Sequence, residues 1–374
     1  MKKASKEDGP IKVLQILPGG HVCGGIENFV MNYYRNIDKT KVQFDFLVHY
    51  NEKGYYDDEI KKLGGHIYYT NVRCDKKIFK YFRYLNSFFK EHKEYKIIHG
   101  HMPGLAPIYF FVAKLRGVKC RISHSHVTNT ERTLKGRILK IVIKNIRFFS
   151  NKYFACSIAA GKFMYGKRNF TVINNAIDVN KFKFNSQKRD ELRKEYKVDD
   201  KFVIGCVGRF NQQKNHKFLI EIFNSVLKIK NNATLLLIGE GELEEQIKLQ
   251  AKELGILDKI QFLGIKSDIY NYYNMFDVFV LPSNFEGLGI VLIESQVNGI
   301  KTITSDVVPR EACVSDLIDF IPLTTSPEEW AKIIVKNVDR KDRIKEIEKV
   351  GYSLKIEAVK LQNRYLDMYK ELEK

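Results

Sequence analysis

The sequence predicts an α/β protein in which two Rossmann-like domains, each with a doubly wound parallel sheet, face a central cleft. Three observations support this. The chain has 374 residues, which is too long for one ordinary core. Short apolar runs alternate with segments of helical periodicity, as in parallel sheets. The alternation stops near residue 178 and starts again near residue 201.

The elements follow this pattern in order. In the first half, strands are expected at residues 11–17, 42–49, 66–69, 96–99, 119–126, 153–156 and 171–174. In the second half, they are expected at residues 202–207, 233–238, 259–262 and 278–281. We therefore expect an N-terminal domain over residues 1–177, a polar linker over 178–200 and a C-terminal domain over 201–352. A final helix near 353–374 is a candidate to pack back on the first domain.

Composition restricts the class of protein. The six cysteines are scattered without a C-x-x-C pair, which favours reduced thiols in a cytosolic protein. We expect no signal peptide and no membrane-spanning segment, because no window approaches 18 apolar residues. Residues 1–175 carry 32 Lys and Arg against 13 Asp and Glu, whereas residues 176–374 carry 31 of each. The whole excess of positive charge therefore belongs to the first half.

The most informative stretch is P-S-N-F-E-G-L-G-I-V-L-I-E-S-Q at residues 282–296. It follows a strand, and its apolar residues from 290 to 297 have helical spacing. The N–H groups of Leu288, Gly289 and Ile290 would point away from the start of that helix, which favours an anion there. Glu286 lies in the turn and Glu294 inside the helix. A ligand with hydroxyl groups at both ends and phosphate in the middle, such as a nucleotide-sugar, fits this arrangement.

Taken together, the motifs resemble the retaining glycosyltransferases of the GT-B fold, family 4, and within it the bacterial capsule and exopolysaccharide enzymes. The resemblance rests on six strings that follow the family's order: G-G-I-E-N-F at 24–29, N-A-I-D-V-N-K-F at 175–182, G-R-F-N-Q-Q-K-N at 208–215, I-G-E-G at 238–241, F-L-G at 262–264 and the two glutamates of E-x7-E at 286 and 294. The second half matches more specifically than the first.

The resemblance assigns roles to individual residues. Arg209 and Lys214 would stabilise the nucleoside diphosphate that leaves when the sugar–phosphate bond breaks, and such fixed cations lower the barrier. Glu294 would bind the ribose hydroxyls, and Glu286 the sugar hydroxyls near C3 and C4. The remaining expected donor contacts are glycines and backbone groups: Gly25, Gly208, Gly264, Ile265, Gly287, Leu288, Gly289 and Ile290.

The resemblance also implies a histidine of the first domain that faces the sugar. In R-I-S-H-S-H, strand alternation places His124 and His126 on one face, and either could be that histidine. His126 is preferred because it lies nearer the carboxyl end of the strand. No D-x-D motif and no metal-ligand spacing is present in the sequence, so neither a metal nor another cofactor is expected.

The basic first half predicts an acidic partner. Residues 132–152 have the pattern of a basic amphipathic helix, which suits the anionic inner face of a plasma membrane, although a core helix with a solvated lysine face has the same pattern. No nucleic-acid motif is present. The expected activity is transfer of a sugar from a nucleotide-sugar to a glycan or polyprenyl-linked acceptor. UDP is the expected nucleotide because it is the most frequent one in the family. The alternatives are a nucleotide-sugar epimerase of the same fold, or a basic membrane- or nucleic-acid-binding protein with an inactive cleft.

Overall fold

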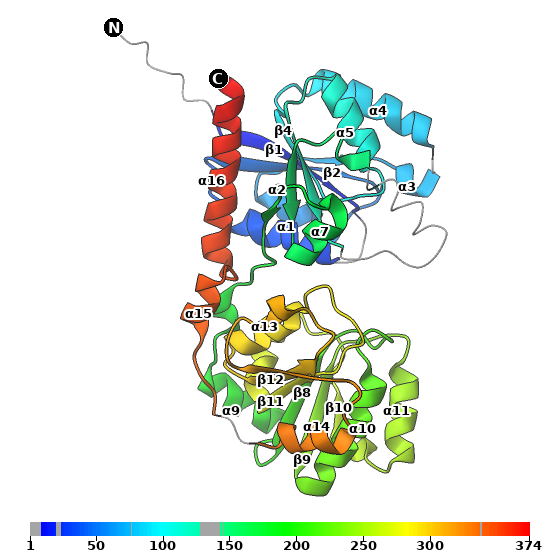
Figure 1. Ribbon diagram of the computed structural model, residues 1–374, viewed down its shortest axis with the longest axis vertical. Helices are drawn as coiled ribbons and strands as arrows, with labels where there is room; N and C mark the ends of the chain where they lie inside the picture. The colour runs from blue at the N-terminus through cyan, green and yellow to red at the C-terminus, as the bar shows by residue number, and fades with distance from the viewer. Residues whose placement is uncertain (1–8, 20–23, 76, 128–142, 144, 337–338) are drawn as a thin grey trace. The chain divides into compact units, whose positions relative to one another are not determined.

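The computed structural model describes residues 9–19, 24–75, 77–127, 143, 145–336 and 339–374. The chain forms two compact units (Figure 1). Unit 1 comprises residues 1–176 together with 354–374, and unit 2 comprises residues 177–353. Of the described helices, none is long and apolar enough to cross a membrane.

Unit 1 is built on a seven-stranded parallel sheet with the strand order β3-β2-β1-β4-β5-β6-β7. The strands are β1 (Ile11–Leu17), β2 (Val42–Val48), β3 (Ile67–Tyr69), β4 (Ile97–Gly100), β5 (Cys120–Ser125), β6 (Lys152–Ala155) and β7 (Thr171–Val172). The helices are α1 (Gly25–Asn36), α2 (Asp57–Lys62), α3 (Val72–Asp75), α4 (Ile78–Glu91), α5 (Ala106–Leu115), α7 (Ile158–Tyr165) and α16 (Leu354–Glu373).

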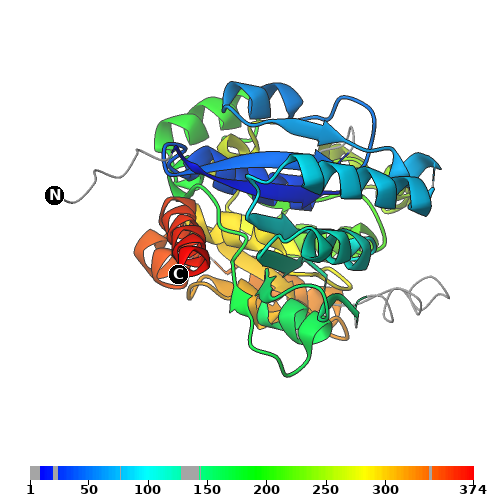
Figure 2. The ribbon, with the colours of Figure 1, turned by 90° about the horizontal axis from the view of Figure 1, so that it is seen from above.

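Helices cover both faces of this sheet, and each face has its own core. One core joins Val13 and Phe44 to α1 and to Tyr365 of α16. The other joins Leu14 and its neighbours to α4, α5 and α7. Alternate residues of β1 therefore enter opposite cores, as expected for a sheet buried on both sides. The final helix α16 runs alongside the sheet in both ribbon views (Figures 1 and 2).

Unit 2 has a six-stranded parallel sheet with the order β10-β9-β8-β11-β12-β13. Its strands are β8 (Phe202–Val207), β9 (Ala233–Ile238), β10 (Ile260–Phe262), β11 (Val278–Leu281), β12 (Lys301–Ser305) and β13 (Ile318–Ile321). Its helices are α8 (Val179–Phe182), α9 (Ser186–Glu195), α10 (His216–Ile229), α11 (Glu244–Glu253), α12 (Ile269–Tyr272), α13 (Ile290–Val297), α14 (Pro327–Ile334) and α15 (Ile344–Lys349). This strand order is that of a Rossmann fold.

Two expectations from the sequence were wrong. Residues 178–200 are not a linker, because they contain α8 and α9, and Val179, Phe182 and Leu192 are part of the core of unit 2. The pattern also missed β12 and β13, which are short and contain polar residues. The membrane-helix hypothesis for residues 132–152 falls largely outside the described residues. The other expected strands are present, with ends that differ by up to two residues.

Candidate functional site

The candidate donor site lies where strands of unit 2 end. Parallel strands place all their carboxyl ends at one edge of the sheet, so the loops after β8, β9 and β10 come together there. Their backbones are hydrogen-bonded to one another: Gly208 N–H donates to the Ile238 carbonyl at 2.9 Å, and Gly239 N–H donates to the Gly264 carbonyl at 3.0 Å. Backbone hydrogen bonds therefore link the three loops at this edge.

Lys214 and Glu286 form an ion pair at this edge. Lys214 Nζ lies 2.7 Å from Glu286 Oε1, and the side chains are only 14% and 5% exposed. Glu286 also accepts hydrogen bonds from Ser283 Oγ at 2.7 Å and from Gln213 Nε2 at 3.2 Å. Gly208 allows this arrangement, since a Cβ there would lie 3.1 Å from the Lys214 side chain. Both groups are thus held in fixed positions.

Glu294 is the fifth residue of α13, about one turn into the helix that follows the turn with Glu286. Its Oε2 accepts a hydrogen bond of 2.7 Å from the Tyr273 hydroxyl. Burial raises the pKa of Glu294 to about 7, against the opposing effects of the Tyr273 hydrogen bond and the Lys214 charge. An acceptor that is enclosed but only partly satisfied suits hydroxyl groups of a ligand.

Arg209 differs from Lys214, Glu286 and Glu294 because its side chain is solvent-exposed. Its side chain is 71% exposed and pairs with Glu242 in the loop after β9, with Nη2 3.1 Å from Oε2. An exposed ion pair of this kind contributes little to stability. The guanidinium can therefore turn toward an anionic ligand at low cost.

The start of α13 is the place where the sequence predicts an anion site. Gly289, the residue before the helix, adopts φ = 76°, a left-handed conformation that favours glycine. Leu288 is buried in the core, Gly287 is exposed, and Ile290 opens the helix as a half-buried residue. At the end of β10, Gly264 also has positive φ, and Ile265 is 72% exposed. The expected donor residues of unit 2 therefore surround one edge of its sheet.

Sequence reasoning missed four partners of these residues: Gln213, Glu242, Tyr273 and Ser283. Ser283 had a detectable signal, because it precedes Glu286 by three residues in the same turn. Tyr273 comes from a short 3-10 helix far from Glu294 in sequence, so only the fold reveals the contact.

In unit 1, four histidines gather at the carboxyl ends of β4 and β5. His99 Nε2 lies 3.1 Å from His124 Nδ1, and His101 Nδ1 lies 2.9 Å from His126 Nε2. Phe29 of α1 packs its ring against three of them. The pairing register of β4 with β5 places these alternate residues on one face of the sheet. Of the four, His126 is half-buried and the others are buried, which agrees with its later position in the chain.

Hydrogen bonds connect this histidine cluster to β1 and α16. His99 Nδ1 lies 2.6 Å from the Tyr365 hydroxyl, and His101 Nε2 lies 2.9 Å from Gln15 Oε1. Since Gln15 Oε1 can only accept, His101 carries its proton on Nε2, and its Nδ1 accepts from His126 Nε2–H. The Nδ1 atom of His126 is then unprotonated and can accept a hydrogen bond.

Burial keeps the four imidazoles neutral. It lowers the pKa of His126 to about 3, and it lowers the pKa values of His99, His101 and His124 well below the ordinary value, with further lowering by neighbouring histidines. His124 Nε2 has no hydrogen-bond partner among the described residues. Nitrogens of His99, His101 and His124 lie within 4.8 Å of one another, which is close enough to share a metal ion. Apart from His124 Nε2, their ring nitrogens are engaged in the hydrogen-bonded chains described above, and a metal would have to replace those contacts.

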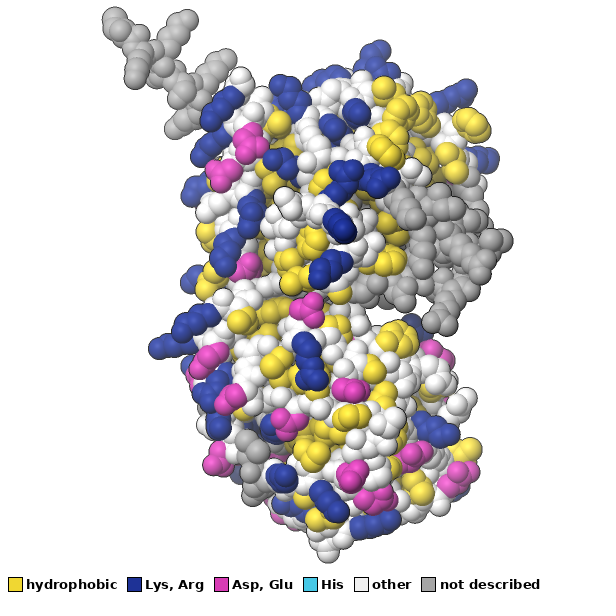
Figure 3. Space-filling view, viewed as in Figure 1, with side chains coloured by type: hydrophobic (Ala, Val, Ile, Leu, Met, Phe, Trp, Pro, Cys, Tyr) yellow, Lys and Arg dark blue, Asp and Glu magenta, His cyan; other side chains and the backbone are white. Residues whose placement is uncertain are grey.

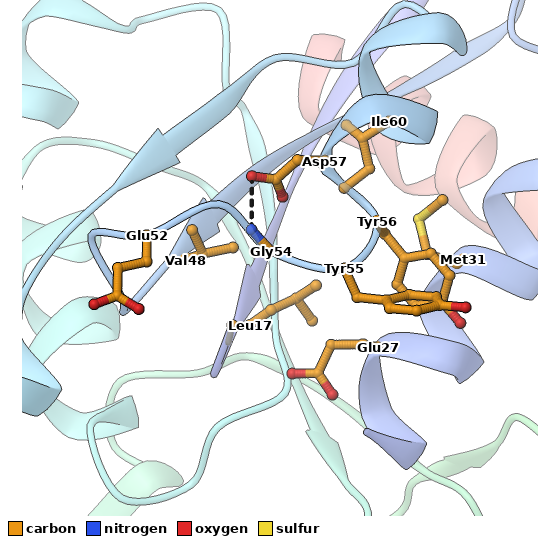
Figure 4. A pocket seen from close by; sticks show the side chains of 11 residues that line it. Leu17, Glu27, Met31, Val48, Glu52, Gly54, Tyr55, Tyr56, Asp57 and Ile60 are labelled. Atoms are coloured by element: carbon orange, nitrogen blue, oxygen red, sulfur yellow. Dashed lines mark hydrogen bonds between the residues drawn. The ribbon is translucent and has the colours of Figure 1, made fainter. Parts of the chain in front are cut away.

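Unit 1 also has a small pocket beside α1, at the carboxyl ends of β1 and β2 (Figure 4). Leu17, Met31 and Val48 form its apolar wall, and Tyr55 and Glu27 border it. Its volume of about 30 Å³ is enough for a water molecule or two and too small for a sugar ring. Gly25 is the first residue of α1, and its contact with a diphosphate stays a prediction.

Comparison with known proteins agrees with this geometry. The family described as "Glycosyl transferases group 1" matches residues 187–353, which contain the whole strand-end site of unit 2. EpsF of Bacillus subtilis, named as a glycosyltransferase, is 32% identical over 95% of this chain and 96% of its own length. The Escherichia coli UDP-Gal:alpha-D-GlcNAc-diphosphoundecaprenol alpha-1,3-galactosyltransferase is 26% identical over 87% of this chain and 90% of its own.

Among solved structures, Anabaena HepE in complex with UDP and glucose has a TM-score of 0.72 at 17% identity, and the match covers 96% of this chain and 100% of HepE. WaaG, a glycosyltransferase involved in lipopolysaccharide biosynthesis, has a TM-score of 0.65 at 14% identity, over 94% and 95% of the two chains. These likenesses show the GT-B fold. With an EpsF match of 32% identity along nearly the whole of both chains, the chain belongs to the group 1 glycosyltransferases of the GT-B fold.

Proposed function

We propose that the protein transfers a sugar from a nucleoside diphosphate sugar, with UDP as the nucleotide, to a lipid-linked glycan during synthesis of a cell-surface polysaccharide. The observation that carries this proposal is the strand-end site of unit 2. One edge of its sheet combines two cations, Arg209 and Lys214, with two carboxylates, Glu286 and Glu294.

Each group has a task in this reaction. Glu294 accepts hydrogen bonds from the ribose hydroxyls, and the start of α13 faces the diphosphate. Arg209 and Lys214 stabilise the charge that develops on the leaving nucleotide. Glu286 orients the sugar through its hydroxyls. In unit 1, the bare Nδ1 of His126 accepts a hydrogen bond from a sugar hydroxyl. These groups supply the charge stabilisation themselves, so we propose that transfer needs no metal and no other cofactor.

Support for the finer details comes from the relatives. The Escherichia coli relative is named for UDP-galactose and a diphosphoundecaprenol acceptor, and a Campylobacter jejuni relative for a diphospho-undecaprenol acceptor. HepE was solved with UDP. We further propose transfer with retention of the anomeric configuration, by displacement on one face of the sugar. The reaction takes place at the cytoplasmic side of the membrane, with the enzyme bound peripherally.

The test begins with calorimetry of the full chain against UDP, GDP and ADP, in which UDP should bind most tightly. Incubation with UDP-sugars and an undecaprenyl-diphosphate-linked sugar should then give a disaccharide whose anomeric configuration NMR shows to be retained. An epimerase would convert the donor without any acceptor. Absence of nucleotide binding would contradict the proposal.

A further inference from the structure

Unit 1 exposes a group of large apolar side chains on α4, on α5 and just before β6. We call Phe79, Phe82, Phe111, Leu115 and Phe148 the aromatic surface. Phe79 is 88% exposed, Leu115 61% and Phe148 57%. Figure 3 shows hydrophobic side chains gathered over α4 and α5, with Lys and Arg around them.

The aromatic surface is continuous from α4 to α5. Phe79 and Phe82 are three residues apart on α4, and Phe111 and Leu115 are four apart on α5, so each pair shares a helix face. The rings of Phe82 and Phe111 lie 6.4 Å apart, which joins the two helices. The ring centre of Phe111 in turn lies 5.3 Å from the ring centre of Phe149, which follows Phe148 in the sequence.

Folding of unit 1 does not require these residues. The opposite face of α4 already supplies the core with Tyr81, Leu85, Phe88 and Phe89. The buried face of α5 does the same through Tyr109 and its neighbours. A contiguous exposed apolar patch on a helix whose other face is already packed indicates an interaction surface.

The charges around the patch identify the partner's chemistry. Residues 77–119 include nine Lys and Arg but only two Glu. Lys80, Arg83 and Lys114 are exposed on the two helices, and the Arg147 guanidinium lies 5.0 Å from the centre of the Phe148 ring. Apolar side chains interspersed with cations complement a surface that has an apolar interior and anionic head groups.

We propose that the aromatic surface docks unit 1 on an anionic lipid bilayer. The phenylalanines and Leu115 enter the boundary between head groups and acyl chains, while Arg83, Lys114 and their neighbours pair with lipid phosphates. Nucleic acid fits less well, because Phe79 and Leu115 offer no hydrogen bond to a phosphate backbone. The inference specifies the membrane contact of the proposed function, but vesicle binding is measured without donor or acceptor. Its failure would therefore leave the transfer reaction untouched.

The test uses the full chain and sucrose-loaded vesicles of phosphatidylcholine, with or without phosphatidylglycerol. The apolar variant combines Phe79→Ser with Leu115→Ser, and the charge variant combines Arg83→Gln with Lys114→Gln. The matched control is Leu249→Ser with Leu254→Ser, because these leucines are also exposed, at 57% and 40%, but lie in unit 2. All variants should melt within a few degrees of wild type, since every changed side chain is exposed.

Wild type and control should sediment with the phosphatidylglycerol vesicles and be released by salt. The apolar variant should lose about tenfold or more in vesicle affinity. The charge variant should lose a similar factor and show a weaker salt dependence. The proposal is wrong if wild type stays in the supernatant, or if the apolar variant sediments like the control. It is equally wrong if the apolar variant leaves vesicle binding unchanged and instead converts a dimer to a monomer in light scattering. The same holds if the charge variant lowers the affinity for RNA but not the affinity for vesicles.

Discussion

Acidification from pH 7.5 to 5.5 should destabilise unit 1 much more than unit 2. His99, His101, His124 and His126 are neutral in the folded protein because burial lowers their pKa values, to about 3 for His126. In the unfolded chain they titrate near pH 6.5. Below that pH the unfolded state binds protons that the folded state does not, so this stability is present above pH 6.5 and lost as the pH falls.

The size of the effect follows from the number of histidines. One proton contributes about 1.4 kcal/mol per pH unit once the pH is well below 6.5. For four histidines the loss is about 4 kcal/mol between pH 6.5 and 5.5, whereas a whole domain is commonly stable by only about 5–15 kcal/mol. In unit 2, burial lowers the pKa of one histidine, His216, to about 4, which predicts about a quarter of that loss.

The single tryptophan allows the two units to be followed separately. Trp330 is fully buried in unit 2, so its fluorescence reports that unit during urea unfolding, while circular dichroism reports both. At pH 5.5 the dichroism curve should begin to fall at much lower urea than the fluorescence curve. His126→Gln should reduce the pH dependence of the free energy of unfolding of unit 1 by the equivalent of about one proton. The reasoning is refuted if, in wild type, the free energy of unfolding from the dichroism transition changes with pH by an amount that corresponds to fewer than two protons.

Four further experiments test the candidate donor site and the fold. Arg209→Ala should lower turnover by about 10²–10³ with unchanged melting temperature, because the side chain is exposed; equal rates at saturating donor would contradict its role. Lys214→Ala should lower both rate and stability, since it leaves Glu286 buried without its cation, whereas Lys214→Met with Glu286→Gln should recover stability but not activity. Calorimetry should show UDP-sugar affinity rising about fourfold from pH 6.5 to 8, because the Glu294 pKa of about 7 limits the carboxylate fraction; Glu294→Gln should remove this rise. Tyr365→Phe should cost about 1–3 kcal/mol in urea unfolding by removing the hydroxyl partner of His99, and Tyr369→Phe, at a half-buried position of the same helix, is its control.

Much of unit 2 could be predicted because its signals are local. The strands from β8 to β11 are short apolar runs, and parallel strands must end at a common edge. Arg209, Lys214 and Glu286 could thus be placed near one another without knowledge of any contact. Their partners could not. Glu242 and Tyr273 reach the site from other strand ends and helices, and no pattern in the sequence around them predicts these contacts.

The errors also have physical causes. Helix α9 has the sequence S-Q-K-R-D-E-L-R-K-E, and of its side chains only Leu192 and Arg193 are buried, so residues 178–200 have the composition of a linker. Arg193 is buried because its guanidinium donates to the Met275 carbonyl and lies 3.2 Å from Asp277. His99 and His101 escape prediction for a different reason. Their H-G-H pattern matches the H-S-H pattern at 124–126, but only the pairing of β4 with β5 brings the two patterns together.

The ion pairs of the donor site explain how it can hold two cations and remain stable without ligand. Lys214 is neutralised by Glu286, and Arg209 by Glu242. A buried lone cation would be costly, whereas a paired one has its charge balanced. In the proposed reaction, an arriving diphosphate would offer the cations a second anion, and the sugar would offer Glu286 hydroxyl donors in place of part of the lysine contact. The ligand would therefore replace internal pairs by equivalent external ones. Because Glu242 and Glu286 would remain beside the cations, release of the charged nucleotide after transfer would also be favoured.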